Sequence, residues 1–271
     1  MNRGHEEPGY PDIIFTKKDG IATITLNRPD KLNAYTPAMS DSLYRAVEDC
    51  SRDDNVRVVI ITGRGRAFCS GADVKAMAAR FADPAAQKAY FENKPGRVPL
   101  HLLMQRCPKP IIGSINGVAA GGGLDFACAC DIRIASDRAR FTEAFIRRGM
   151  MPATGGTYYL PRQVGIDRAL LMCWTGDMID AQEALRIGLV TMVVPHDELE
   201  LATLELAEKL ARGPTLAIQK IKRAVYAGLE MDLAETLRYV SREVQELNRT
   251  RDHREGAQAF VEKREPRFRG E

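Results

Sequence analysis

The sequence predicts an α/β fold followed by a helical C-terminal region, on three observations. Up to about residue 195, short runs rich in Val and Ile alternate with segments of helical periodicity, which favours stacked parallel strands. Two glycine-containing junctions lead from predicted strands toward helices. Beyond residue 195 the periodicity is helical only. We therefore expect a core over residues 1–195 and a helical region over residues 196–271.

The first elements are a hairpin, a capped helix and a buried strand. After a polar leader, strands at 13–15 and 21–26 flank a turn at 18–20. Thr36 and Pro37 supply an N-cap and a first-turn signal, and apolar periodicity extends a helix over about 37–51. A buried strand at 56–62 leads into a loop at 64–73, which ends in Asp73, a typical N-cap residue.

The later elements continue this alternation and then abandon it. Helical segments are predicted to about residue 106, followed by strand 111–115, a glycine turn with its helix, and strand 132–135. Four C-terminal helices are expected at 198–211, 214–227, 232–248 and 252–263. Their apolar stripes favour a packing surface over a ligand site, and another subunit is a natural partner.

Composition excludes several classes of partner and site. The net charge is +3, from 39 basic and 36 acidic residues, which argues against nucleic acid as the main partner. Six cysteines without paired spacing indicate buried, reduced thiols, and we expect a cytoplasmic protein. Four scattered histidines make a metal site improbable. No run of about 20 apolar residues occurs, so no membrane association is expected.

The most informative segment is the glycine junction at residues 111–125, where a buried strand runs into bare backbone and then a helix containing Asp125. A helix start leaves amide N–H groups unpaired, and glycines let a ligand approach them closely. Its spacing fits neither dinucleotide-binding nor P-loop fingerprints. Tight packing of the helix on the strand is an alternative reason for the glycines.

A second junction at residues 69–73 has a similar character, with small residues before Asp73. Backbone donors aimed at a developing negative charge commonly make the greatest single contribution to catalysis. Two such donors, one from each junction, would form an oxyanion hole.

Ordered motifs along almost the whole chain resemble those of the crotonase (enoyl-CoA hydratase/isomerase) superfamily. They lie at residues 27–34, 67–73, 116–125, 130–132, 175–177, 188–190 and 254–264. The resemblance implies a crotonase-like core of stacked β-β-α turns, forming a spiral, with a C-terminal helical trimerisation region. It also implies a homotrimer or homohexamer.

The resemblance further implies an acyl-CoA thioester substrate, with coenzyme A as part of the substrate and no separate cofactor. The N–H groups of Ala72 and Gly122 would hold the thioester carbonyl as it becomes an enolate. The resemblance implies further contacts with the coenzyme A portion. One subunit would supply Arg66, Ser70, Gly71 and Asp73, and a neighbouring subunit would supply Phe260 and Lys263.

The acid and base decide which reaction an enolate site performs. Hydratases of the family use two glutamates, and the first position holds the shorter carboxylate Asp125. The second position holds Phe145, and a further carboxylate position used by some isomerases holds Ala153. A surface or structural role for Asp125 near a helix start remains an alternative, because an acidic residue there suits the helix dipole.

Glu143 is a candidate replacement for the missing carboxylate. In an extended segment 142–145 it would share a face with Phe145, and a short register change would bring it inward. Alternatively, Glu143 pairs with Arg147 on one turn of a helical segment.

Three functions remain open on these residues: an enoyl-CoA hydratase, a double-bond isomerase working with one carboxylate, and an acyl-CoA-binding homologue without activity. Serine and cysteine nucleophiles fit less well. No G-x-S-x-G sequence occurs, and Cys69 has no histidine nearby in sequence to activate it.

Overall fold

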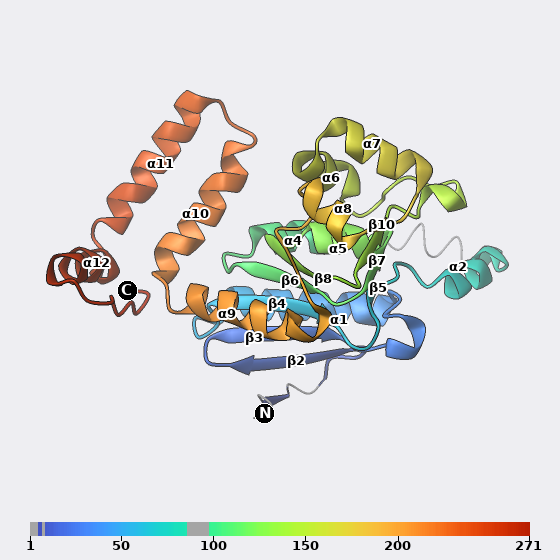
Figure 1. Ribbon diagram of the computed structural model, residues 1–271, viewed down its shortest axis with the longest axis horizontal. Coiled ribbons are helices and arrows are strands. Elements are labelled where there is room, and N and C mark those ends of the chain that lie inside the picture. The colour runs from blue at the N-terminus through green and yellow to red at the C-terminus, as the bar shows by residue number, and fades with distance from the viewer. Residues whose placement is uncertain (1–4, 7–8, 86–97) are drawn as a thin grey trace.

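The core contains two sheets wrapped by helices (Figure 1). The computed structural model describes residues 5–6, 9–85 and 98–271. The larger sheet pairs its first three strands antiparallel and the rest parallel. Its strands, in spatial order, are β1 (His5–Glu6), β2 (Ile13–Lys18), β3 (Ile21–Leu26), β4 (Val58–Gly63), β6 (Ile111–Ile115), β8 (Ile132–Ser136) and β11 (Met192–Val194).

The smaller sheet carries both glycine-containing junctions. Its parallel strands are joined by one antiparallel edge strand. In spatial order the strands are β10 (Ile179–Asp180), β9 (Arg140–Thr142), β7 (Val118–Ala120) and β5 (Ala67–Cys69). The predicted α/β class and hairpin are confirmed, and stacked parallel strands occupy the centre of both sheets.

Alternating side chains of β4 explain why helices cover both faces of the larger sheet. Val58 and Ile60 pack against α9 (Leu199–Ala211), whereas Val59 and Ile61 face the main core. Helix α1 (Pro37–Arg52) contributes to that core, and the Thr36 hydroxyl accepts a hydrogen bond from the Met39 amide at 3.0 Å. The predicted cap and helix are confirmed.

The other core helices are short and connect the strands. They are α2 (Val74–Phe81), α4 (Leu100–Arg106), α5 (Gly122–Cys128), α6 (Gly156–Val164), α7 (Ile166–Thr175) and α8 (Ala181–Arg186), with 3-10 turns η1 (Pro29–Lys31), η2 (Ile146–Arg148) and η3 (His196–Glu198). Parts of the predicted helical stretch before residue 106, and of the polar leader, lie outside the described residues.

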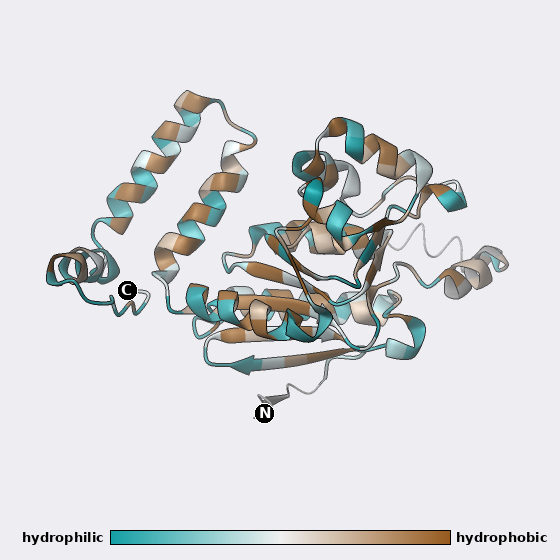
Figure 2. Cartoon of the chain, viewed as in Figure 1, coloured by the Kyte–Doolittle hydropathy of each residue, from teal (hydrophilic) through white to brown (hydrophobic). Residues whose placement is uncertain are grey.

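The C-terminal helices extend away from the core, on the left of Figure 1. They are α10 (Thr215–Gly228), α11 (Leu233–Leu247) and α12 (Arg251–Glu262), close to the predicted bounds. Apolar bands alternate with polar ones along α10 and α11 (Figure 2). Large apolar side chains stay exposed in this region, including Ile221, Val225, Leu229, Leu233, Leu237 and Val244.

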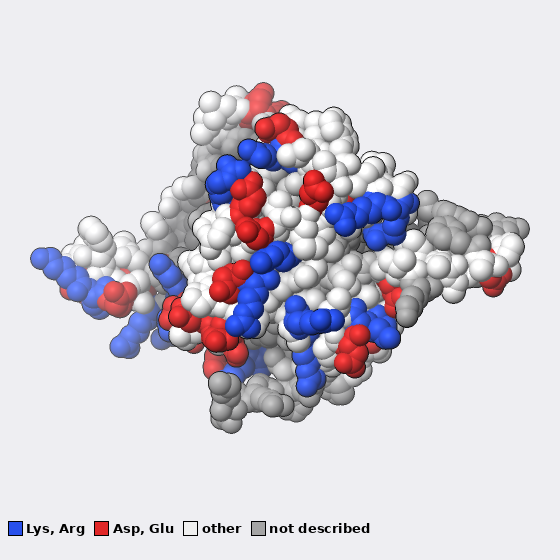
Figure 3. All heavy atoms as spheres, turned by 45° about the vertical axis from the view of Figure 1, so that its right-hand side comes forward, with Lys and Arg blue, Asp and Glu red and all other residues white. Residues whose placement is uncertain are grey.

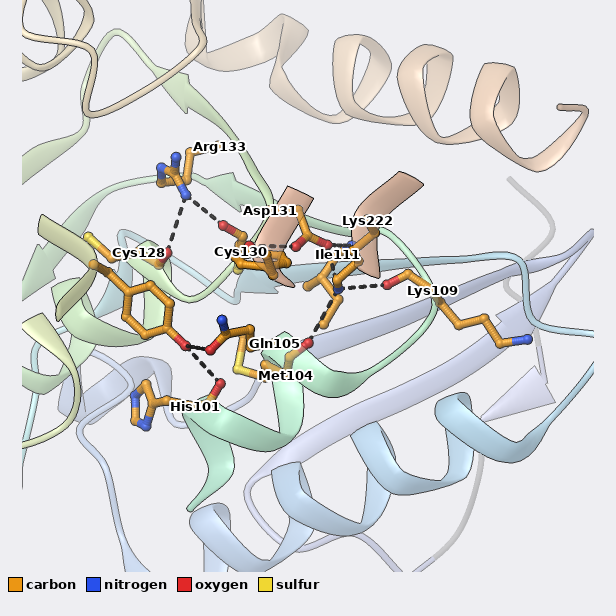
Figure 4. Close-up of polar contacts among 12 residues, drawn as sticks. His101, Met104, Gln105, Lys109, Ile111, Cys128, Cys130, Asp131, Arg133 and Lys222 are labelled. Atoms are coloured by element: carbon orange, nitrogen blue, oxygen red, sulfur yellow. Dashed lines mark hydrogen bonds and ion pairs between the residues drawn. The ribbon is translucent and has the colours of Figure 1, made fainter. Parts of the chain in front are cut away.

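A partly buried ion pair fastens α10 to the core (Figure 4). The Lys222 ammonium lies 2.7 Å from the Asp131 carboxylate and donates to the carbonyl oxygens of Met104 and Lys109 at 3.3 and 3.0 Å. Tyr226, one turn further along α10, donates its hydroxyl to Asp131 at 2.8 Å. A charge pair with its remaining hydrogen bonds made can be retained in the interior.

Surface and thiol features agree with the composition. Acidic and basic side chains are interspersed over the face drawn in Figure 3. All six cysteines are free thiols, five of them buried. None of the helices in the described ranges combines the length and the apolar character needed to cross a bilayer. Within the same ranges, His, Cys, Asp and Glu side chains form no cluster of three or more suited to a metal ion.

Candidate active site

The segment after β5 presents the Ala72 amide toward the second junction. Tyr35 donates its amide to the Gly71 carbonyl at 2.7 Å and accepts from the Asp73 amide at 3.3 Å. In this parallel bridge between Tyr35 and Ala72, the Ala72 N–H points to the opposite side. Gly71, with φ +88°, brings the segments together, because a Cβ there would lie 3.5 Å from the Gly122 nitrogen.

Two neighbouring glycines at the start of α5 serve different purposes. A Cβ on Gly123 would lie 2.1 Å from the Cys69 carbonyl oxygen, so this glycine permits packing of the helix on β5. A Cβ on Gly122 would meet only the Thr154 hydroxyl, at 3.7 Å. The packing explanation therefore holds for Gly123. The Gly122 position is open, and its nitrogen lies 3.5 Å from the Cβ position of Gly71, the residue before Ala72. Two backbone donors so arranged can bind an oxyanion.

Asp125 is fully buried on α5, which overturns the alternative that it is a surface residue. Its Oδ2 accepts hydrogen bonds from the Thr154 amide at 3.0 Å and the Thr154 hydroxyl at 2.5 Å. Burial raises the pKa of Asp125, and these hydrogen bonds oppose the rise. A carboxylate held in this way can accept a proton from a bound reactant.

Glu143 lies beside Asp125, fully buried and directly after β9. A Cβ on Gly156 would be 2.2 Å from Asp125 Oδ1 and 3.0 Å from Glu143 Oε1, so both carboxyl groups face that glycine. Burial, and secondarily the charge and contact of Asp125, raise the pKa of Glu143 to about 9. The alternative pairing of Glu143 with Arg147 is wrong, because Arg147 is exposed.

The predicted extended segment 142–145 is also wrong, and this explains how Glu143 turns inward. Strand β9 ends at Thr142, and Phe145 has helical backbone angles at the start of η2. The buried Phe145 ring lies 3.6 Å from the position that a Cβ on Gly121 would occupy. The Arg148 guanidinium lies equally close to that position. Phe145 thus lies next to the oxyanion donors, whereas Glu143 lies on the Gly156 side of Asp125.

The residues expected to contact coenzyme A fall into two groups. Arg66 lies exposed before β5, and Ser70 is half-buried after it, about 13 Å away for a strand rise of about 3.3 Å per residue. Gly71 follows, and Asp73 forms an ion pair with Arg28 at 3.6 Å while its carbonyl accepts the Met77 amide of α2.

The second group lies in the C-terminal region. Phe260 is 86% exposed on α12, and Lys263 ends that helix with φ +55°. Figure 1 shows α12 at the end of the molecule opposite β5 and α2. Within one chain, the structure does not bring these two residues to the site.

Sequence reasoning missed two residues of the site, Thr154 and Gly156. Both follow Ala153, whose exposed methyl group stands where a further carboxylate was considered. The signal that could have found them was the Gly155-Gly156 pair at the start of α6, since glycines often mark a close approach of other groups. It gives no indication that the approaching groups are two carboxyls.

Cys69 does not offer an alternative nucleophile. Its thiol is fully buried, and burial raises its pKa to about 12, so the reactive thiolate is suppressed. The arrangement of two backbone donors and a buried carboxyl pair is suited instead to stabilising an enolate and moving a proton.

Comparisons with known proteins identify the family of this chain. The sequence profile described as "Enoyl-CoA hydratase/isomerase" matches residues 16–271. A "Probable enoyl-CoA hydratase" of Rhodobacter capsulatus is 40% identical, with 96% of this chain and 99% of the relative aligned. The "1,2-epoxyphenylacetyl-CoA isomerase" of Escherichia coli is 36% identical, with coverage of 95% and 98%. The crystal structure of an enoyl-CoA hydratase from Bacillus anthracis superposes with a TM-score of 0.87 at 35% identity, covering 96% of this chain and all of that one.

Proposed function

The chain belongs to the enoyl-CoA hydratase/isomerase family, and from that premise we propose that it is an enoyl-CoA hydratase, adding water to the double bond of a 2-enoyl-CoA. The observation that carries the proposal is the buried Asp125 carboxyl, held by Thr154 on the helix that begins with Gly122. This combination provides a proton acceptor beside backbone donors.

In the proposed reaction, the N–H groups of Ala72 and Gly122 bind the thioester oxygen. Asp125 accepts a proton from water while the water oxygen forms a bond to the β-carbon. The electron pair of the double bond moves onto the thioester oxygen, giving the enolate that the two donors stabilise. The enolate then collapses, and the α-carbon takes the proton from Asp125. One carboxyl can therefore serve both proton transfers, and the net change is the addition of one water molecule.

The substrate's coenzyme A portion is proposed to lie along β5 and the segment that follows, with Arg66, Ser70, Gly71 and Asp73 in contact. Coenzyme A then belongs to the substrate, and no separate cofactor is required. Phe260 and Lys263 would complete the site from a neighbouring copy, since they lie far from it in their own chain. The exposed apolar faces of α10 and α11 support a homotrimer or homohexamer. We propose a cytoplasmic role in fatty acid metabolism.

Double-bond isomerisation is the second candidate, and Phe145 is the observation that favours it. The ring replaces a proton-transferring group next to Gly121, which leaves Asp125 as the carboxyl available to a substrate. One carboxyl can move a proton between the α- and γ-carbons without activating water. A relative at 36% identity is named as an isomerase.

A coupled absorbance assay separates the two candidates. The purified protein is incubated with 2-enoyl-CoA esters of several chain lengths, starting with crotonyl-CoA, and with 3-enoyl-CoA esters. Loss of the conjugated enoyl chromophore from the first set supports hydration. Appearance of that chromophore from the second set alone supports isomerisation. If calorimetry shows acyl-CoA binding but neither absorbance change occurs, both candidates are contradicted, and the protein is an acyl-CoA-binding homologue without activity.

A further inference from the structure

Asp125 and Glu143 form a buried pair of acids whose oxygens are unequally satisfied. Oδ2 of Asp125 is occupied by the amide and hydroxyl of Thr154. Oδ1 of Asp125 and both carboxyl oxygens of Glu143 have no hydrogen-bond partner of ordinary geometry in the structure. These unsatisfied oxygens lie around Gly156, where the two carboxyl groups face each other.

Two ionised carboxylates in this position would be unfavourable on two counts. Their charges would repel at short range in the protein interior, and three buried acceptor atoms would have no donor. A single proton removes the repulsion, because a protonated carboxyl carries no charge, and its O–H supplies a donor that pairs one Glu143 oxygen with Asp125 Oδ1.

We propose that Asp125 and Glu143 hold one proton between them, and that Glu143 is a positioning residue whose O–H orients the Asp125 carboxylate for proton transfer. The proposal rests on the function proposed above. It assigns to Glu143 a role at a position where the crotonase motifs require no carboxylate.

Among the residues that the structure describes, no cation contributes to the pKa shift of Glu143, which comes from burial and from Asp125. The titratable neighbours whose own pKa values respond to both acids are Cys128 on α5 and Cys173 on α7. Burial raises the pKa of both thiols, that of Cys173 to about 11, so they are neutral at physiological pH. The pKa of Glu143 is raised to about 9 by burial first, then by Asp125. Neutralisation of the pair thus depends on a proton.

The placement of the two acids indicates which one meets the substrate. Thr154, which holds Oδ2 of Asp125, is exposed, so that side of the carboxyl faces the open part of the site. Oδ1 points the other way, toward Gly156 and Glu143. Glu143 therefore acts through Asp125, which places it among positioning residues and leaves Asp125 as the catalytic acid and base.

Replacement of Glu143 by Ala and by Gln tests the positioning role. Glu143→Ala removes the donor, and we expect kcat to fall about 100-fold with little change in KM, as for a misplaced catalytic group. Glu143→Gln retains an N–H donor of similar shape, and we expect it to recover about tenfold of that loss. The wild-type rate should fall above about pH 9 as Glu143 ionises, and the Gln variant should lack this fall.

A second readout needs no substrate and so separates this proposal from the proposed function. The infrared C=O band of a protonated carboxylic acid should be present at neutral pH in the wild type and disappear as the pH rises through about 9. Glu143→Gln should remove the band, and the control Glu200→Gln, at an exposed position on α9, should keep it.

Three results would overturn the proposal. The first is the absence of that band in the wild type. The second is a Gln variant as inactive as the Ala variant, which would mean that Glu143 itself transfers a proton to the substrate. The third is an Ala variant with wild-type kcat. If every substrate fails but the band behaves as expected, only the proposed function falls.

Discussion

Two acids lie near opposite ends of α5, and their surroundings compensate them in different ways. Asp125 near the start of the helix faces Glu143, another acid. Asp131, just after its end, faces the Lys222 ammonium at 2.7 Å and also accepts from Tyr226 and from the Ile111 amide. The second cluster is a complete ion pair that joins α10 to the core (Figure 4). In the described part of the chain no cation shifts the pKa of Glu143 in the first pair, which therefore needs a proton.

This difference separates stability from chemistry within one short helix. An acid that faces a cation and accepts further hydrogen bonds, as Asp131 does, links the elements that carry its partners. An acid whose neighbour is another acid has a raised proton affinity, which is the property of a general acid or base near neutral pH. The structure thus assigns Asp131 to holding the fold and Asp125 to the reaction.

Removing the charge of Asp125 should have the largest effect, a loss of catalytic rate. Asp125→Asn keeps the shape but cannot accept a proton, so we expect kcat to fall about 10²- to 10⁴-fold. Binding of acyl-CoA, measured by calorimetry, should persist because the backbone donors remain. The exposed Asp167→Asn serves as control and should keep full activity. A wild-type rate for Asp125→Asn would mean that another group does the chemistry.

Removing the Lys222 cation, which faces Asp131, should lower the stability of the fold. Lys222→Met leaves the partly buried Asp131 without its counter-charge, and we expect a loss of about 1.5–3 kcal/mol in the free energy of unfolding. Activity per folded molecule should stay constant. The exposed Lys209→Met should change stability by less than about 0.5 kcal/mol.

Chemical denaturation at fixed protein concentration measures both variants. A double variant, Lys222→Met with Asp131→Leu, should regain part of the loss, since the unpaired acid is then gone. If Lys222→Met unfolds like the control, the ion pair does not fasten α10.

Crowding the carboxyl pair should have an intermediate effect. Gly156→Ala would place a Cβ 2.2 Å from Asp125 Oδ1, which forces the acids apart. We expect stability to fall by about 1–3 kcal/mol and kcat to fall as well. Gly228→Ala is the matched control, because its Cβ would meet nothing closer than 3.5 Å. Denaturation and steady-state rates together check this, and an active, stable Gly156→Ala would show that the pair tolerates displacement.

Much of the fold could be predicted from the sequence because its signals are local. Thr36 and Pro37 identified the start of α1, and the helical periodicity after residue 195 identified α9 to α12. The ladder of β4 between β3 and β6 was less accessible, because pairing partners distant in sequence leave no local mark. The sequence did suggest buried parallel strands, which is what these are.

The site was only partly predictable. Both glycine junctions and Asp125 could be identified, because glycines at strand ends and acidic residues are recognisable in the sequence itself. The inward turn of Glu143 could not, since it depends on β9 ending at Thr142 and on helical backbone angles at Phe145. The Thr154 contact and the space at Gly156 arise from a loop folding back onto α5, which local patterns do not encode.

The pH dependence of stability tests the contrast between the two clusters most directly. The pKa of Glu143 is about 9 in the folded protein and about 4.5 when unfolded, so the folded state binds more protons between these values. Stability from this group is complete below about pH 4.5 and is lost as the pH rises to about 9, by up to about 1.4 kcal/mol per unit. Unfolding free energies of the wild type and Glu143→Gln are compared across this range. We predict that the wild type loses stability relative to the variant as the pH rises; curves that stay parallel would contradict a shared proton.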